Sequence, residues 1–282
     1  MKLTQIKGPD GRPTAAIVES GGYRLIPGKT ITDLIVMTET RDVAMGDLAL
    51  ELAAEDVIEA KAGLPITPAE VWACGCTYAP SAEFRDTELG TREGMYAYVH
   101  NPEHRPEIFF KGTARHCVGP GEPIGIRADS KFTAPEPELG VVIDAAGRVL
   151  GYTLGNDVSA WDIERENALY LPQSKVYTAC CALGPVVVTP DEIPDPYSLE
   201  MTCTIRRGAR VTFEGSCSTN KLRRKVEELI DYLRRSNTVP SPTVVLTGTG
   251  IIVTEDAALA PGDVVRIEIP EIGVLENEAQ PV

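Results

Sequence analysis

One stretch of the sequence, residues 136–157, constrains the fold more than any other. It begins with Glu136 and Glu138 around a proline and continues into an apolar run at 141–143, a pattern typical of a strand buried on both faces. A glycine-containing turn near its midpoint and a returning strand that ends at Asp157 complete a predicted hairpin. A strand of this kind needs partners on both sides, so the hairpin predicts a sheet-rich core around it.

Three carboxylates of this hairpin are predicted to converge. Glu136 and Glu138 lie two residues apart on an extended segment, so their side chains point to the same side. Folding the chain at the turn brings Asp157 roughly opposite Glu138. Three carboxylates this close repel one another unless a cation lies among them, and hard divalent cations prefer oxygen ligands. The hairpin therefore predicts a site for Mg²⁺, with Mn²⁺ or Ca²⁺ as alternatives, although a Glu-X-Glu pair on a solvated strand face is the other interpretation.

Length and charge restrict the class of protein. With 282 residues, 43% of them hydrophobic, the chain can bury a large core. The net charge of −14 disfavours nucleic acid and anionic membranes as partners. The sequence has no apolar run of transmembrane length and no secretion signal, and its seven cysteines fit reduced thiols better than a disulfide framework. We therefore expect a cytoplasmic protein.

The remaining patterns indicate an α+β protein. Residues 1–67 are predicted to form a small N-terminal α/β module, with two strands within 15–26 and helical stretches within 32–60, ahead of a catalytic domain at 68–282. An amphipathic helix is predicted from the apolar spacing over 222–233, with capping residues just before it. The alternating segment near the C-terminus reads as a half-buried strand.

Lys175 is a candidate base, because it stands just ahead of a nearly charge-free stretch. An ammonium drawn into apolar surroundings loses basicity and can accept a proton near neutral pH; the alternative is a lysine whose stem lies along the surface. Glu107, Phe109 and Lys111 share one face of a predicted strand, as a cross-strand ion pair or as one wall of a site. Thr249 lies in a glycine-rich turn whose amides and hydroxyls could hold a carboxylate.

Taken in order, the motifs resemble those of the fumarylacetoacetate hydrolase superfamily over roughly residues 70–280. They are Glu136-Pro-Glu-Leu-Gly, Gly155-Asn-Asp-Val-Ser-Ala, Lys175 with Leu183-Gly-Pro, Leu246-Thr-Gly-Thr, Pro261-Gly-Asp-Val-Val and Ile272-Gly-Val-Leu-Glu-Asn. The resemblance implies a β-rich core of mixed sheets rolled around a metal site. It also implies a homodimer or homotetramer that binds 2-oxo acids through their carboxylate and ketone. The implied Mg²⁺ ligands are Glu136, Glu138 and Asp157.

Local sequence assigns a branch within this superfamily. Its C–C hydrolases usually carry histidine three residues after the tyrosine matched by Tyr78, where this chain has Ser81. The segments 77–88 and 105–111 are instead similar to the 2-keto-3-deoxy-pentonate dehydratases of pentose breakdown. In that branch the positions of Glu107 and Lys175 lie beside the substrate. The resemblance thus implies a hydro-lyase that converts a 2-keto-3-deoxy sugar acid, derived from D-xylose or arabinose, to 2,5-dioxopentanoate by enolate-forming elimination of water.

Such an elimination requires a base at C3 and a proton donor at the C4 hydroxyl, with a metal acting as Lewis acid. We predict Lys175 as the base and Glu107 as the donor, or the reverse. The predicted substrate contacts are Ser81, Arg85, Lys111, Thr249 and Tyr78. For two of these the alternatives are an ion pair of Arg85 with Asp86 or Glu88 and a core position for Tyr78.

Three other functions stay open. One is an acylpyruvate-type C–C bond hydrolase in which His100 or His104 replaces the missing histidine. Another is a 2-oxo-acid tautomerase or decarboxylase, which needs the metal but no C4 proton donor. The third is a metal-dependent binding protein without turnover, which Lys175 and Glu107 disfavour because binding alone requires no base. The sugar acid, its C4 configuration, the physiological metal and the choice between dimer and tetramer stay open too.

Overall fold

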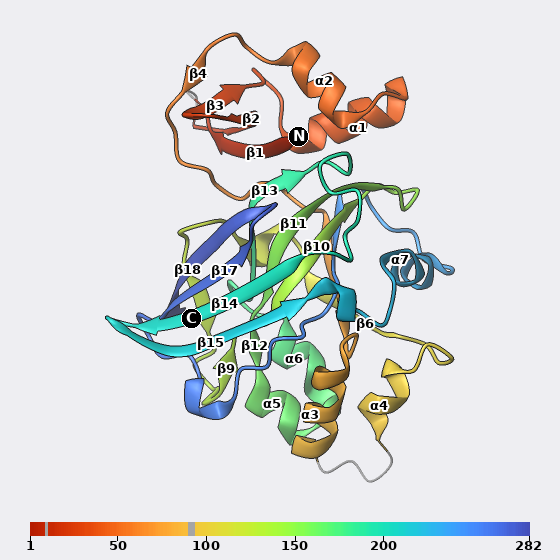
Figure 1. Cartoon of the computed structure of the whole chain (residues 1–282), viewed down its shortest axis with the longest axis vertical. Coiled ribbons are helices and arrows are strands. Elements are labelled where there is room, and N and C mark those ends of the chain that lie inside the picture. The colour runs from red at the N-terminus through yellow and green to blue at the C-terminus, as the bar shows by residue number, and fades with distance from the viewer. Residues whose placement is uncertain (9–10, 90–93) are drawn as a thin grey trace.

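The predicted hairpin lies in the middle of an eleven-stranded mixed sheet in the computed structural model, which describes residues 1–8, 11–89 and 94–282 (Figure 1). In spatial order the strands are β4 (Val57–Ile58), β3 (Gly22–Leu25), β2 (Pro13–Glu19), β1 (Lys2–Lys7), β13 (Cys181–Val188), β11 (Val149–Asp157), β10 (Pro137–Ile143), β16 (Thr243–Leu246), β5 (Glu70–Gly75) and β6 (Glu107–Gly112), with β7 (Cys117–Val118) paired to β13. Every residue of β10 is buried, which confirms the prediction of a strand covered on both faces.

A second sheet covers one face of the first. Its five strands are, in spatial order, β15 (Arg210–Ser218), β14 (Glu200–Arg207), β17 (Val264–Ile269), β18 (Gly273–Pro281) and β8 (Ile124–Ile126). Side chains of β10, β11, β14 and β17 pack together in one apolar core between the sheets. The alternating burial of β17 confirms the half-buried strand predicted near the C-terminus. A short pair, β9 (Thr133–Ala134) and β12 (Ser159–Ala160), lies beyond the two sheets.

The register of the central hairpin differs from the prediction by two residues. Glu138 is paired with Gly155, and Asp157 donates its backbone N–H to the carbonyl of Glu136 at 2.9 Å. An irregularity between Val142 and Ile143 shifts the pairing next to the turn. Because side chains repeat every two residues along a strand, the two-residue difference from the predicted pairing leaves Asp157 on the same face as the two glutamates.

The N-terminal residues form the predicted α/β arrangement of β1–β4 with two helices, α1 (Ile31–Arg41) and α2 (Met45–Leu52). These helices pack their apolar sides on the face of the long sheet opposite the second sheet. Strand β1 pairs antiparallel with β13, so the sheet continues without interruption into the core. A domain boundary after residue 67 stays a prediction.

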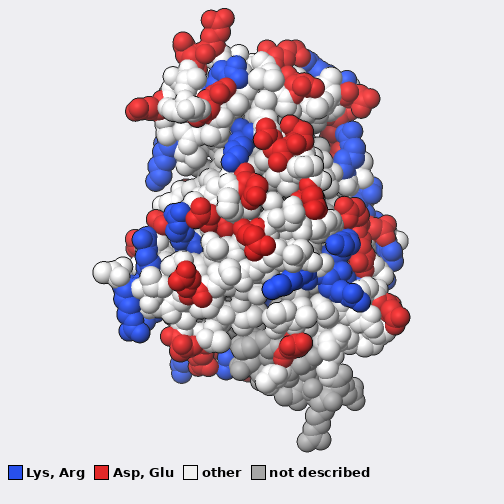
Figure 2. Space-filling view, viewed as in Figure 1, with Lys and Arg blue, Asp and Glu red and all other residues white. Residues whose placement is uncertain are grey.

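Four helices gather at the end of the sheets away from this N-terminal part (Figure 1). They are α3 (Ala79–Leu89), α4 (Met95–His100), α5 (Trp161–Glu166) and α6 (Leu171–Lys175). Single 3₁₀ turns occur at Ala114–His116, Ala168–Tyr170, Thr219–Lys221 and Glu255–Ala257. Figure 2 shows acidic and basic side chains interspersed over one face of the molecule.

The predicted amphipathic helix begins later than its apolar spacing indicated. It is α7 (Val226–Arg234), and the capping residues predicted for it form the 3₁₀ turn at Thr219–Lys221 instead. Leu222 lies before the helix but is still buried. Within the described residues no helix has both the length and the apolar character to cross a membrane.

Candidate active site

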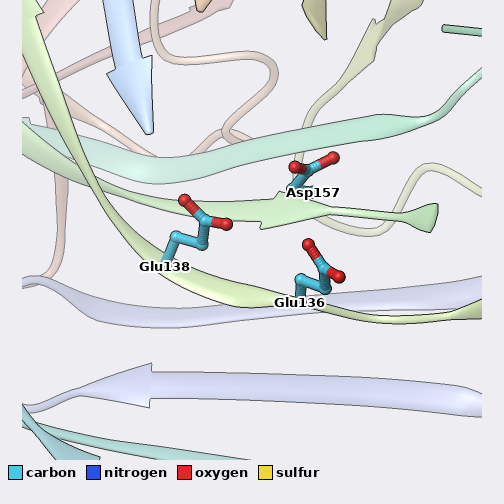
Figure 3. A group of neighbouring side chains, drawn as sticks. All are labelled: Glu136, Glu138 and Asp157. Atoms are coloured by element: carbon cyan, nitrogen blue, oxygen red, sulfur yellow. The ribbon is translucent and has the colours of Figure 1, made fainter. Parts of the chain in front are cut away.

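Glu136, Glu138 and Asp157 converge at one end of the central hairpin. Each offers a carboxylate oxygen within 4.8 Å of the others, and all three residues are buried. Glu138 lies on β10 with Glu136 just before it, and Asp157 ends the neighbouring β11 (Figure 3). Carboxylate oxygens alone are the donor set of hard divalent cations, so these three residues fit Mg²⁺, Mn²⁺ or Ca²⁺.

The balance of charge around the three carboxylates also favours a divalent cation. Five acidic side chains form one connected cluster: Glu107, Glu136, Glu138, Asp157 and Glu164. Three cationic side chains lie among them: Arg85, Lys111 and Lys175. With every group ionised, this cluster of described residues carries two more negative than positive charges. One divalent cation would neutralise the excess.

Within the cluster, Glu138 is the least compensated carboxylate. Glu136 contacts Lys175, Arg85 and the indole N–H of Trp161. Among the described residues, Glu138 receives only the backbone N–H of Gly248, at 2.5 Å, and has no ion-pair partner. Burial, with the nearby carboxylates adding to it, raises the pKa of Glu138 well above its usual value.

Gly248 makes this contact possible. Its φ is +92°, and a Cβ at this position would lie 2.0 Å from the hydroxyl oxygen of Thr77. Only glycine adopts this conformation at no steric cost and brings its amide this close to a buried carboxylate.

We expect the metal-free protein to lose stability as the pH rises through the elevated pKa of Glu138. A carboxyl whose pKa is raised by folding favours the folded state while it is protonated, and that contribution disappears once it ionises, at about 1.4 kcal/mol per unit of pKa elevation. Saturating Mg²⁺ should remove the decline. Thermal unfolding of the wild type and of Glu138→Gln across pH, with and without Mg²⁺, measures it; equal pH profiles for the two metal-free proteins would contradict this account.

Lys175 lies among carboxylates, so the predicted apolar surroundings were wrong. Its Nζ is 2.6 Å from Glu136, 3.4 Å from Asp157 and 2.7 Å from the hydroxyl of Ser159. Burial by itself lowers the pKa of Lys175, but Asp157 and Glu136 outweigh it and the pKa is raised. A second cation bound to the same carboxylates opposes the ammonium form. Basicity at Lys175 is thus linked to occupancy of the metal site.

Lys111 supports the site from behind. Its fully buried ammonium contacts Asp157 Oδ1 at 2.5 Å and donates to the carbonyls of Val158 and Lys175 at 2.9 and 2.6 Å. An ammonium has three donors; two of them are used by these carbonyls, and the positive charge forms the ion pair with Asp157. These contacts indicate that Lys111 positions Asp157 and α6. The contact with substrate that was predicted for Lys111 stays a prediction.

Arg85 connects the metal-binding carboxylates to a second pair of acids. Its guanidinium lies 3.3 Å from Glu136, 3.4 Å from Glu164 and 3.5 Å from Glu107. Contacts of Arg85 with sugar hydroxyls of a substrate stay a prediction. Two alternative partners have side chains outside the described residues: Asp86 and Glu88.

Glu164 is a site residue that the sequence reasoning missed. It is buried on α5, one turn after Trp161, and its Oε2 lies 3.9 Å from Lys175 Nζ. The available signal was the helical spacing, because residues three apart share a face and a buried tryptophan marks the inward side.

A cavity of about 230 Å³ opens beside these residues. Its acidic lining residues are Glu107 and Glu164, and its remaining walls are Met95, Tyr96, Val99, Ala168 and Leu171. Burial raises the pKa of Glu107 although Arg85 opposes the shift, which suits a group that donates a proton. A larger cavity of about 610 Å³ lies between α2 and the ends of β11 and β13, and its lining contains none of the predicted site residues.

The sequence profile described as "Fumarylacetoacetate (FAA) hydrolase C-terminal" matches residues 87–280. This chain belongs to the fumarylacetoacetate hydrolase family. It is 52% identical to the 2-dehydro-3-deoxy-D-arabinonate dehydratase of Saccharolobus solfataricus over 75% of this chain and 72% of that protein. It is 42% identical to a probable 2-keto-3-deoxyxylonate dehydratase of Haloferax volcanii over 90% and 89%. A solved 2-keto-3-deoxy-D-arabinonate dehydratase in complex with magnesium and 2,5-dioxopentanoate matches with a TM-score of 0.84 and 40% identity, covering 100% and 99% of the two chains.

The histidines of this family member have other partners. His100 Nδ1 lies 2.7 Å from the carbonyl of Cys76, and His104 stacks on Tyr98 with ring centroids 3.6 Å apart. His116 Nδ1 accepts the backbone N–H of Thr113 at 3.0 Å. Among the residues that the structure describes, no histidine lines the cavity beside Glu107.

Three residues predicted to contact substrate are buried near the site, and their contacts within the protein do not test that prediction. Ser81 and Tyr78 are buried, and the hydroxyl of Tyr78 has no hydrogen-bond partner in the described part of the chain. Thr249 uses its hydroxyl within its own turn, accepting from the amide of Ile251 at 3.1 Å. Contacts of these three residues with substrate stay predictions.

Replacing Gly75 by alanine should expel the carboxylate of Glu107 from its place. A Cβ at residue 75 would lie 2.0 Å from Glu107 Oε2, a distance that forces one group to move. We expect kcat to fall on the order of tenfold or more while Mg²⁺ affinity, measured by calorimetry, stays unchanged. Gly63→Ala is the matched control, because its Cβ would meet only an atom 3.7 Å away. Equal kcat for the two variants would show that the position of Glu107 is immaterial.

Proposed function

We propose that this chain is a metal-dependent dehydratase that converts a 2-keto-3-deoxy pentonate to 2,5-dioxopentanoate. The observation that carries the proposal is that three structural features lie together in one buried cluster. A carboxylate site fits a divalent cation, Lys175 touches that site, and a small cavity lined by Glu107 begins beside it. The similarity to named dehydratases over most of the chain supports the same reaction.

The metal would polarise the C2 ketone of a bound 2-oxo acid and so make the C3 hydrogen acidic. Lys175 is placed to take that proton, since its Nζ borders the carboxylates that hold the metal. Glu107 donates a proton to the departing C4 hydroxyl, and the raised pKa of its carboxyl keeps that proton available. Loss of water leaves a C3–C4 double bond, and removal of a proton from C5 with return of a proton to C3 gives a C5 enol, which tautomerises to the aldehyde of 2,5-dioxopentanoate. The roles of these two residues are exchangeable on the present geometry.

The absence of a histidine from the cavity lining disfavours the hydrolase alternative, because hydrolysis needs a group that activates water. The apolar walls formed by Tyr96, Val99 and Leu171 further limit the entry of water beside Glu107. A tautomerase would need no proton donor at C4. These features favour elimination over both alternatives.

Incubating the Mg²⁺-loaded protein separately with D- and L-configured 2-keto-3-deoxy pentonates and with acetylpyruvate tests this proposal. We expect 2,5-dioxopentanoate from at least one sugar acid and no cleavage of acetylpyruvate. Removing the metal with a chelator should abolish product formation, and adding Mg²⁺ back should restore it. Cleavage of acetylpyruvate without dehydration of any pentonate would overturn the proposal.

The predicted homodimer or homotetramer and the cytoplasmic location belong to the same proposal, as does the division into residues 1–67 and 68–282. The family resemblance supports the assembly, and the seven cysteines, which are all free thiols, support the location. Sedimentation velocity tests the assembly, where a monomer at micromolar concentration would contradict it.

A further inference from the structure

The cavity beside the metal-binding carboxylates has an unusual distribution of charge. Its two charged lining residues within the described part of the chain are both acids, Glu107 and Glu164, and the other walls are apolar or aromatic. The nearest guanidinium, that of Arg85, is divided among these two acids and Glu136. The charged groups that an entering ligand meets on the cavity walls are therefore carboxylic acids and not cations.

Glu164 has an oxygen available for a ligand. The residue is 2% exposed, and its Oε1 contacts Arg85 at 3.4 Å. Its Oε2 lies 3.9 Å from Lys175 Nζ, and Oε2 of Glu107 lies 3.5 Å from Arg85, but neither oxygen has a hydrogen-bond partner among the described residues. A buried carboxylate oxygen that accepts no hydrogen bond carries a desolvation cost that a hydroxyl group of a ligand would reduce.

The tail of a five-carbon 2-oxo acid reaches this position. A ligand held through its C1 and C2 oxygens at the carboxylate trio extends about 4 Å from C2 to C5. Lys175 Nζ lies between the metal-binding carboxylates and the cavity, 2.6 Å from Glu136 on one side and 3.9 Å from Glu164 on the other. C4 and C5 of the ligand would thus lie next to the carboxylate oxygens that accept no hydrogen bond.

We propose that Glu164, together with Glu107, selects 2-oxo acids by the charge of their tail. Hydroxyl-bearing tails are accepted, and tails that end in a second carboxylate or a phosphate are rejected. The inference rests on the proposed function for the way the head group is held. It adds to that function a residue that selects the tail, Glu164, and the class of 2-oxo acids that is excluded, those with an anionic tail.

The physical basis is the difference between a donor and an anion. A hydroxyl donates a hydrogen bond to a carboxylate oxygen, whereas an ionised carboxylate has only acceptors. Placed beside Glu164, a second ligand carboxylate would meet a like charge in a poorly solvated space, and the protonated Glu107 of the proposed elimination offers it no cation. Arg85 provides little relief, because three protein carboxylates already share it.

Binding of two matched ligands tests this inference. 2-Oxopentanoate and 2-oxoglutarate have the same five-carbon 2-oxo acid chain and differ only in a terminal methyl or carboxylate. With Mg²⁺-loaded wild-type protein we expect calorimetry to give a Kd for 2-oxoglutarate at least roughly tenfold weaker than that for 2-oxopentanoate. In Glu164→Gln the difference should shrink roughly tenfold, through tighter 2-oxoglutarate binding at unchanged 2-oxopentanoate binding.

Glu166→Gln is the control, because it removes the same charge from the exposed side of the same helix. It should leave both affinities as in the wild type. In Glu164→Gln the KM for a 2-keto-3-deoxy pentonate should also rise, since one hydroxyl partner changes from carboxylate to amide.

Three outcomes would overturn the inference. The first is equal binding of the two ligands by the wild type, a measurement that does not depend on whether any variant folds. The second is an unchanged ratio in Glu164→Gln. The third is loss of 2-oxopentanoate binding in that variant, which would place Glu164 at the head group. None of these depends on turnover, so failure of the dehydratase proposal would be recognised separately, by absence of product from every pentonate.

Discussion

Glu138→Gln should abolish Mg²⁺ binding and lower kcat/KM for the dehydration by on the order of 10³-fold, the scale expected when a main electrostatic contributor is lost. The wild-type carboxylate has the backbone amide of Gly248 as its one hydrogen-bond donor among the described residues. Because no cationic side chain among the described residues pairs with this carboxylate, its negative charge can be neutralised by a bound cation. Glutamine keeps the size of the side chain but removes that charge, and its NH₂ group cannot act as a ligand.

Calorimetric titration with Mg²⁺ and a dehydration assay at saturating metal measure the two effects separately. Glu214→Gln is a suitable control, because it makes the same change at an exposed position of β15. The metal-free variant should unfold at or above the wild-type temperature near neutral pH, since it lacks a buried ionisable group with a raised pKa. Full Mg²⁺ affinity in Glu138→Gln would show that this residue is not a ligand.

Lys175→Met should lower kcat by on the order of 10² or more while Mg²⁺ binding is retained or becomes tighter. The ammonium contacts Glu136 and Asp157, so it competes with a cation for the same oxygens. Removing it eliminates the base and the competitor together. A merely structural lysine would lower metal affinity when lost, which makes the direction of the affinity change informative.

Single-turnover assays and calorimetry on the same preparations provide the two readouts. Lys131→Met, at an exposed position, controls for the loss of one positive charge. Turnover close to that of the wild type would remove Lys175 from the mechanism. Weaker Mg²⁺ binding would instead indicate that the ammonium stabilises the arrangement of the carboxylates.

Much of the fold follows from local pattern. The hairpin at 136–157 was predictable because buried strands and turns have strong local signals. Its register was predicted only to within two residues, since the strands reverse between Ile143 and Val149, earlier than the midpoint of residues 138 and 157. For α7 the apolar stripe was clear, but Leu222 extended the stripe beyond the helix, because a 3₁₀ turn can place a buried residue on the same side.

The surroundings of individual site residues were less predictable. Lys175 precedes an apolar stretch in sequence, yet its neighbours in space are carboxylates from other segments. The same is true of Arg85, whose partners lie far along the chain. Such contacts depend on the order of strands in the sheet, and a single sequence carries that order only through its resemblance to a family.

The strand order has a consequence for how the protein is made. The carboxylates, lysines and arginine of the site come from segments between residues 85 and 175, but the amide that holds Glu138 belongs to residue 248, after β16, which lies between β10 and β5. A chain still on the ribosome cannot complete this carboxylate site until Gly248 has been synthesised, long after all of its charged residues. Magnesium would then bind after the strands of the sheet have come together, and it would not act as a template for folding.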